Sequence, residues 1–348
     1  MVKNFTGKPP IIIAHRGASG YRPEHTLAAY ELAMPTAGCA YALGADYIEP
    51  DLVSTKDCVL IARHENEISE TTDIANHAKF AHRRTTKIID GESKIGWFTE
   101  DFTLAELKTL RAKERIGQLR SQNTVYDGLL EIPTLQEIID LVKRKSAEIN
   151  RAIGIYPETK HPTYFQSIGL ALEAPLLATL TANGYQGANA PVFIQSFEVS
   201  NLQDLSTKTD LPLVQLLNNR GKPYDFVVSG DERTYVDLAT ASGLKEIAKY
   251  GRAVGIHKNL LVPRDSSGKL RRRKAACRQT SPTSLVIDAH AAGLLVHVWT
   301  FRNEDYFLPL VFQGNPEGEY ELFFNLGVDG VFSDYPDTAC AVRENLYK

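Results

Sequence analysis

Short apolar segments rich in β-branched residues alternate with helical segments along most of the chain. We expect these apolar segments to be strands, and they lie at 11–14, 47–53, 59–62, 152–156, 192–194, 213–217, 253–256, 294–298 and 328–332. Strands that are separated by helices pair in parallel, so the pattern predicts an α/β fold. About eight strand–helix units favour one closed (β/α)8 barrel. An open sheet is disfavoured because no G-x-G-x-x-G turn follows the first strand.

The predicted helices carry recognisable start signals. Two S/T-x-x-E capping boxes, at 103–106 and 134–137, open helices that we expect to run to about 111 and 145. Further helices are expected at about 27–43, 166–183, 200–205, 235–249 and 284–292. The polar stretch from about 66 to 101 has no strong period, and we interpret it as a small insertion after the second strand. The whole chain, 1–348, is expected to form a single domain.

Composition narrows the possible functions. The net charge of -3 and the 43% hydrophobic residues are typical of a globular protein and favour neither nucleic acid nor an anionic membrane as a partner. The basic loop at 270–274 lacks interleaved aromatic residues, so a solvated loop is preferred to an anionic docking patch. No apolar run approaches the roughly 20 residues of a membrane span, and the start shows no secretory signal. The cysteines at 39, 58, 277 and 340 show no CxxC spacing, and buried free thiols are preferred to disulfides.

Two carboxylates stand two residues apart in the predicted strand at 47–53. Side chains alternate between the faces of a strand, so Glu49 and Asp51 should point the same way. Like charges repel, and a divalent cation with oxygen ligands would remove that cost. Taken alone, such a pair is more often a loop flank or the partner of a cation.

Other polar side chains follow the predicted strands at the same edge. His15 and Arg16 end the first strand, and Glu158 and Lys160 follow the strand at 152–156. In a barrel these ends meet at one rim, so Glu158 should join the two carboxylates of the second strand. The alternatives are an ion pair of Arg16 with Glu49 and a simple salt bridge between Glu158 and Lys160.

Two histidines and a tryptophan complete the predicted rim. His64 follows the strand at 59–62, and Trp299 ends the strand at 294–298. Histidine can transfer protons near neutral pH, so His15 and His64 could act as an acid–base pair. Carboxylates, cations and histidines together indicate phosphate-ester chemistry. A histidine at a strand end is otherwise more often a hydrogen-bonded structural residue.

These residues resemble the signature of the glycerophosphodiester phosphodiesterase family, over nearly the whole chain. The matching motifs occur in family order: His15-Arg16-Gly17, Pro23-Glu24-His25-Thr26, Glu49-x-Asp51, His64, Glu158-x-Lys160, Gln195-Ser196-Phe197, Val298-Trp299-Thr300 and the run from Gly327 to Asp334. Many members have asparagine where His25 stands. The periplasmic-type, calcium-using subgroup often has histidine there.

The resemblance implies a TIM barrel with a small insertion after the second strand. It implies one divalent cation on Glu49, Asp51 and Glu158, with Ca²⁺ favoured over Mg²⁺ and Glu24 close by. It also implies His15 and His64 as the acid–base pair, Arg16 as a phosphate ligand, and Lys160, Gln195 and Trp299 around the substrate. Glycerophosphodiesters such as glycerophosphocholine and glycerophosphoethanolamine would yield sn-glycerol 3-phosphate and an alcohol. In this family a cyclic intermediate, formed by attack of the glycerol 2-hydroxyl, has been proposed.

Two other functions stay open. A sphingomyelinase D-like phospholipase would share the barrel and the rim, but we would expect it to expose an apolar loop, whereas the stretch at 76–84 is polar. A non-catalytic phosphodiester-binding protein would be expected to have a broken site. The resemblance implies a periplasmic or extracellular location, and a cytoplasmic one stays open. Headgroup preference and oligomeric state do not follow from the sequence.

Overall fold

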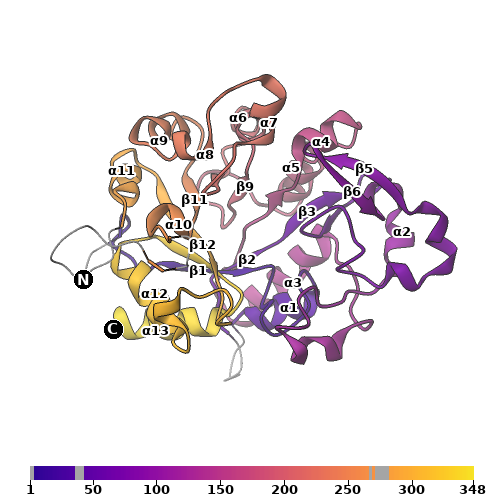
Figure 1. Cartoon of the computed structure of the whole chain (residues 1–348), viewed down its shortest axis with the longest axis horizontal. Helices are drawn as coiled ribbons and strands as arrows, with labels where there is room; N and C mark the ends of the chain where they lie inside the picture. The colour runs from indigo at the N-terminus through magenta and orange to yellow at the C-terminus, as the bar shows by residue number, and fades with distance from the viewer. Residues whose placement is uncertain (1–3, 36–42, 266–268, 271–281) are drawn as a thin grey trace.

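The computed structural model describes residues 4–35, 43–265, 269–270 and 282–348, and Figure 1 shows its helices arranged around a curled central sheet. Among the described residues this sheet has eleven strands: β1 (Ile11–His15), β2 (Tyr47–Glu49), β3 (Asp51–Ser54), β4 (Leu60–Ala62), β7 (Gly154–Ile155), β8 (Glu158–Thr159), β9 (Ile194–Ser196), β10 (Leu213–Leu217), β11 (Ala253–His257), β12 (Leu295–Phe301) and β13 (Gly330–Ser333). Their order is β4-β3-β8-β9-β10-β11-β12-β13-β1-β2-β7. Neighbours pair in parallel except β3 and β4, which are antiparallel.

Proline interrupts two stretches of the sheet. Pro50 separates β2 from β3, and Pro157 lies between β7 and β8. Proline has no N–H group to donate to a strand ladder, so a short break forms at each site. The two broken stretches still run side by side, because β2 pairs with β7 and β3 pairs with β8. The strand predicted at 47–53 is therefore two strands, and the one predicted at 152–156 is shorter than expected and is followed by a second short strand after Pro157.

A compact apolar cluster links strands that are far apart in the order of the sheet. It consists of Ile13, Tyr156, Val214, Ala253, Leu295 and Phe332. The stretches that contribute them are β1, the segment between β7 and β8, and β10 to β13. Such side chains can meet only if the sheet curls toward itself, as in TIM-barrel-like folds.

The helices cover the outside of this sheet. They are α1 (Leu27–Ala33), α2 (Leu104–Leu107), α3 (Leu135–Glu148), α4 (Pro162–Ser167), α5 (Glu173–Ala182), α6 (Val199–Ser206), α7 (Tyr224–Ser229), α8 (Tyr235–Leu238), α9 (Ala241–Ile247), α10 (Lys258–Leu261), α11 (Leu285–Ala291), α12 (Pro316–Asn325) and α13 (Pro336–Leu346). Short 3₁₀ helices are η1 (Ile74–Asn76), η2 (Ala78–Arg83), η3 (Thr99–Asp101), η4 (Ser121–Tyr126) and η5 (Leu310–Phe312). None of the helices in the described ranges has the length and apolar character needed to cross a membrane.

Both predicted capping boxes are confirmed. The side chains of Thr103 and Thr134 accept hydrogen bonds from the backbone three residues on, and the glutamates there bond back. The helix after Thr134 is α3, which buries one apolar face and packs against α1. The helix after Thr103 is shorter than predicted: it ends at Leu107 instead of at about 111.

Three helices predicted as single segments are wrong in extent. The one at 166–183 is two helices, α4 and α5, because Gly169 takes a left-handed φ of 76°. The one at 235–249 is also two, α8 and α9, because Thr240 caps the second by accepting from Gly243. The one at 27–43 ends at Ala33, before Pro35. Its remainder, at 36–42, lies outside the described residues.

Residues 66–101 hold η1, η2, η3 and an antiparallel pair of strands, β5 (Thr85–Ile89) and β6 (Glu92–Gly96). Figure 1 shows this pair at one end of the molecule, near α2. Asp90 and Gly91 join the two strands with φ values of 49° and 81°, the positive pair that a type I′ hairpin turn requires. The Asp-Gly signal was present in the sequence, but no hairpin was predicted there.

The cysteine prediction holds in part. Cys58 and Cys340 are free thiols, and Cys340 is buried as expected, whereas Cys58 is exposed. Cys39, Cys277 and most of the basic loop, 271–274, lie outside the described residues.

Candidate active site

The carboxyl ends of the strands surround a cavity of about 300 Å³. Eight of the nine side chains predicted for the site line it: His15, Arg16, Glu49, Asp51, His64, Glu158, Gln195 and Trp299. The ninth is Lys160, whose Nζ lies 2.9 Å from Oε1 of Glu158 and 3.4 Å from Nε2 of His64. The structure therefore brings the whole predicted set together.

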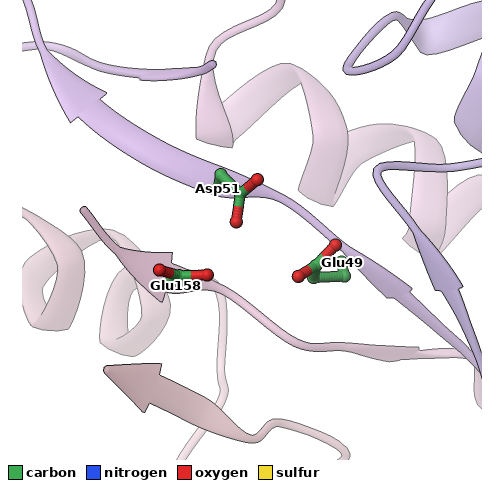
Figure 2. Close-up of side chains that lie close together, drawn as sticks. All are labelled: Glu49, Asp51 and Glu158. Carbon is green, nitrogen blue, oxygen red and sulfur yellow. The ribbon is translucent and has the colours of Figure 1, made fainter. Parts of the chain in front are cut away.

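Three buried carboxylates line this cavity, and Figure 2 shows that their side chains lie close together on neighbouring stretches of chain. Glu49 ends β2, Asp51 begins β3 and Glu158 begins β8. The parallel register of β3 and β8 places Asp51 opposite Glu158. One oxygen atom of each carboxylate lies within 4.8 Å of the others, and none of the three residues is more than 5% exposed. A single hard cation bound by oxygen atoms needs such a group of acids.

The charges of the three acids are strongly coupled. Burial raises the pKa of Glu49 well above its usual value, and the charges of Asp51 and Glu158 add to the effect. Burial also raises the pKa of Glu158 to about 8, although Lys160 opposes the shift. The pKa of Asp51 is held low despite its burial, because Lys160 and the hydrogen bond from His25 favour the ionised form. A bound cation would offset the repulsion that adds to the raised pKa of Glu49 and Glu158.

Buried oxygen atoms without a hydrogen-bond donor are a second reason why these residues fit a divalent cation. Oδ1 of Asp51 and Oε1 of Gln195 are buried and have no hydrogen-bond donor among the described residues. Leaving a buried acceptor unpaired costs about 1–3 kcal/mol. The Gln195 amide sits against the acids, because its Nε2 donates to Oε1 of Glu49 over 3.0 Å. Carboxylate and amide oxygens are the ligands that Ca²⁺ and Mg²⁺ take in proteins.

His15 ends β1 and is oriented by a carboxylate. Its Nδ1 lies 2.6 Å from Oδ1 of Asp334, and no described residue hydrogen-bonds its Nε2. Arg120 and Arg302 pair with the other oxygen of Asp334, at 2.5 and 2.9 Å, and keep the pKa of this buried acid well below its usual value. Burial lowers the pKa of His15 to about 4, with Arg16 adding to the shift and Asp334 opposing it. Its imidazole is therefore neutral at neutral pH and can accept a proton at Nε2.

His64 has a similar arrangement after β4. Its Nδ1 bonds to the carboxylate of the adjacent Glu65, and its Nε2 faces the ammonium group of Lys160. Desolvation lowers the pKa of His64 to about 3, with Arg16 and Lys160 adding to the shift and Glu65 opposing it. A carboxylate on Nδ1 of each histidine fixes the tautomer and leaves Nε2 for chemistry.

The Arg16 side chain forms ion pairs with acidic residues, but not with Glu49, the partner considered from the sequence. Its Nη1 lies 3.0 Å from Oε2 of Glu24, and its Nε lies 3.4 Å from Oδ2 of Asp51. Only its backbone N–H contacts Glu49, over 2.8 Å. Glu24 is thus close by as the family signature implies, but it pairs with Arg16 and Arg115 and does not join the cluster of three carboxylates.

Several residues that shape the site were given no role from the sequence. His25 links Oδ2 of Asp51 (2.9 Å) to the hydroxyl of Tyr30 (2.7 Å), and the guanidinium of Arg63 donates to the His25 carbonyl. Asp334 and Glu65 orient the two histidines. Asp334 ends a motif quoted above and Glu65 follows His64, so the sequence did contain a signal for these two residues. Arg115 and Arg120 come from the loop between the two capping boxes, which carried none.

Aromatic rings form one wall of the cavity. Trp299 lies inside β12, not at its end as predicted, and its Nε1 donates to the carbonyl of Gly255 over 3.0 Å. Its ring stands edge-on to Phe197, with centroids 5.7 Å apart, and to His257, at 4.9 Å. All three rings line the cavity.

Comparisons with known proteins identify the family of the chain. The family model of the glycerophosphoryl diester phosphodiesterases matches residues 15–338. The glycerophosphodiester phosphodiesterase GDPD6 of Arabidopsis thaliana is 36% identical over 351 residues, which cover 96% of this chain and 87% of that protein. A glycerophosphodiester phosphodiesterase of Haemophilus influenzae is 28% identical over 94% of this chain and 88% of its own length.

Solved structures show the same fold. A phosphodiesterase of Oleispira antarctica, in complex with the product sn-glycerol-3-phosphate, superposes with a TM-score of 0.61 at 20% identity, covering 98% of this chain and 99% of that one. A glycerophosphodiester phosphodiesterase of Agrobacterium tumefaciens gives 0.58 at 19% identity, over 95% and 99% of the two chains. Fold and sequence likeness together define a phosphodiester hydrolase. The chain belongs to the glycerophosphoryl diester phosphodiesterase family.

Proposed function

We propose that this enzyme hydrolyses glycerophosphodiesters, such as glycerophosphocholine and glycerophosphoethanolamine, to sn-glycerol 3-phosphate and the free alcohol. The observation that carries the proposal is the convergence of Glu49, Asp51 and Glu158 in one cavity with His15 and His64. The sn-glycerol-3-phosphate bound by the Oleispira antarctica phosphodiesterase supports the choice of product.

Glu49, Asp51 and Glu158 would hold one divalent cation, with the Gln195 amide oxygen beside them. The cation supplies positive charge that offsets the charge of the phosphate oxygens. We favour Ca²⁺ over Mg²⁺, because Ca²⁺ accepts irregular sets of oxygen ligands whereas Mg²⁺ demands near-octahedral geometry. The calcium-using subgroup is periplasmic, and by that resemblance we infer a periplasmic or extracellular location.

His15 and His64 would move the protons. One imidazole would take the proton of the attacking hydroxyl at its Nε2. The other would give a proton to the oxygen of the departing alcohol, and it must first gain that proton, because burial keeps the pKa of both rings low. Asp334 and Glu65 would stabilise whichever ring is charged, because each carboxylate accepts from Nδ1. If attack by the glycerol 2-hydroxyl gives a cyclic phosphate, water opens it with the two roles reversed.

The remaining predicted residues would position the substrate. Arg16 and Lys160 add positive charge next to the carboxylates, and Arg16 would bind a phosphate oxygen. Trp299 would pack against the glycerol carbon atoms from the aromatic wall.

We also infer that the curled sheet closes as a (β/α)8 barrel in a single domain, 1–348, with residues 66–101 inserted after the second strand. Each end of the strand order holds a segment from the same two chain stretches, β2 with β3 and β7 with β8, which supports closure. The cluster of side chains shared by six stretches supports it as well.

A substrate panel tests the proposed function. We expect Ca²⁺-loaded protein to release sn-glycerol 3-phosphate from glycerophosphocholine and glycerophosphoethanolamine, measured with a glycerol-3-phosphate dehydrogenase coupled assay. Chelator should abolish the release and added Ca²⁺ should restore it. Turnover of sphingomyelin alone would instead identify a sphingomyelinase D-like enzyme. Binding of glycerophosphocholine without turnover, under any divalent ion, would identify a binding protein.

A further inference from the structure

The cavity that holds the three carboxylates extends to a second group of side chains with opposite charge. These residues, the basic wing, are His257, Lys258, Asn259, Arg264 and Arg302, and all of them line the cavity. They come from the end of β11, from α10 and from the segments that follow α10 and β12. The helix α10 packs against both strands (Figure 1). The mechanism above gives none of them contact with the substrate, although Arg302 pairs with Asp334.

The basic wing carries a positive charge in excess. The ammonium group of Lys258 lies 2.8 Å from Oε2 of Glu319, and Nη2 of Arg264 lies 2.9 Å from Oε1 of the same carboxylate. Two cations therefore share one acid. Glu319 is 1% exposed and Lys258 is 6% exposed, so water screens the excess charge poorly.

His257 adds a hydrogen-bond donor to this surface. The backbone N–H of Asn259 donates to its Nδ1 over 3.0 Å, so the neutral ring carries its proton on Nε2. Burial lowers the pKa of His257 to about 4, and the charges of Lys258, Arg264 and Arg302 contribute to this shift, which agrees with an electropositive surface. Oδ1 of Asn259 is buried and has no donor within the described part of the chain, so it can accept from an ammonium or hydroxyl group.

The basic wing is connected to the catalytic side of the cavity. Nε of Arg302 and Nδ1 of His15 bind the two oxygens of the same carboxylate, Asp334, at 2.9 and 2.6 Å. Trp299 links the two halves, because its ring contacts His257 of the basic wing and Phe197, whose ring centroid lies 5.8 Å from Nζ of Lys160. A substrate with its phosphodiester at the three carboxylates can therefore extend one end past Trp299 to the basic wing.

We propose that the basic wing binds a second anionic group, a carboxylate or a phosphate, on the departing alcohol of the substrate. The inference rests on the proposed function and adds its substrate class: glycerophosphodiesters with an anionic headgroup are preferred. Arg264 would pair with that group in the way guanidinium groups pair with carboxylates and phosphates. A choline headgroup meets the excess positive charge and is turned over more slowly.

Two matched substrate pairs test the proposal on the Ca²⁺-loaded protein. Glycerophosphoserine and glycerophosphoethanolamine differ by one carboxylate, and glycerophosphoinositol 4-phosphate and glycerophosphoinositol differ by one phosphate. We expect kcat/KM to be about tenfold higher for the anionic member of at least one pair, since a charge-assisted hydrogen bond is worth that much. The pair that shows the preference identifies the anionic group. A ratio of about one in both pairs overturns the anionic subsite while leaving the hydrolase intact, whereas no turnover of any diester overturns the proposed function itself.

Substitutions can separate direct binding of the anionic headgroup by Arg264 from a long-range effect of positive charge. Arg264→Gln should reduce the preference to a ratio of about one, and Arg264→Lys should keep part of it. Arg220→Gln is the control, because Arg220 also lowers the pKa of His257 but does not line this cavity. A preference that survives Arg264→Gln in folded protein, or that is lost in Arg220→Gln, contradicts direct binding at the basic wing.

Discussion

Glu158→Gln is expected to lower kcat/KM for glycerophosphocholine by about a thousandfold. The substitution keeps the shape of the side chain but removes one of three charges whose oxygen atoms lie within 4.8 Å of one another. The Ca²⁺ affinity should fall with the activity, and isothermal titration calorimetry measures that loss. Thermal unfolding separates this effect from damage to the fold. Without metal the variant should be at least as stable as the natural protein, because burial and Asp51 raise the pKa of Glu158 to about 8.

With metal, the order of stability should reverse. A ligand present at a hundred times its Kd stabilises the folded state by about 2.7 kcal/mol, and the variant should lose most of that gain. Glu198→Gln is the matched control: Glu198 is 3% exposed and its pKa is also raised to about 8, but it is bonded to Thr163 outside the carboxylate cluster. Unchanged Ca²⁺ affinity in Glu158→Gln, or an equal loss in Glu198→Gln, would rule out the proposed cation site.

His15→Ala and His64→Ala should each lower kcat by about 10²- to 10⁴-fold, the range found for a positioned acid or base. The kcat of the double variant should be only slightly lower than the kcat of the less active single variant, since the two groups act in one step. A glycerophosphodiester with a nitrophenyl leaving group assigns the roles. Its departing oxygen needs no proton, so the variant that lacks the first-step acid should recover most of its rate on this substrate, and the variant that lacks the base should not.

His290→Ala provides the control for the histidine variants. Its Nε2 lies 2.8 Å from Oδ2 of Asp329, so it is also a histidine paired with a carboxylate, but it does not line the cavity. Activity should be unchanged in this variant. Near-normal kcat in both His15→Ala and His64→Ala would show that other groups transfer the protons.

The sequence predicted the site better than it predicted the helices, for a physical reason. Strands in parallel sheets place their carboxyl ends at one edge, so short-range patterns were enough to bring Glu49, Asp51 and Glu158 together. The capping boxes of α2 and α3 were also local signals. Helix extent depends on single residues that end a helix, and Gly169 and Thr240 each divided a segment whose pattern of apolar residues was continuous.

Contacts between distant parts of the chain were not predictable in the same way. Asp334 orients His15 across more than three hundred residues, and Arg120 reaches the same carboxylate from a loop without secondary-structure signals. The basic wing is similar, because Lys258 and Arg264 become a cationic surface only where both share Glu319 from α12. Such groupings depend on which faces of β11, α10 and α12 meet, and no local pattern determines that.

Crystals of the protein grown with Ca²⁺ test the central claim most directly, through the anomalous difference map. We predict one peak in the cavity with oxygen atoms of Glu49, Asp51 and Glu158 about 2.3–2.6 Å away. A peak elsewhere, or none in crystals of protein that stays fully active in chelator, would contradict the three-carboxylate site on which the proposed hydrolysis depends.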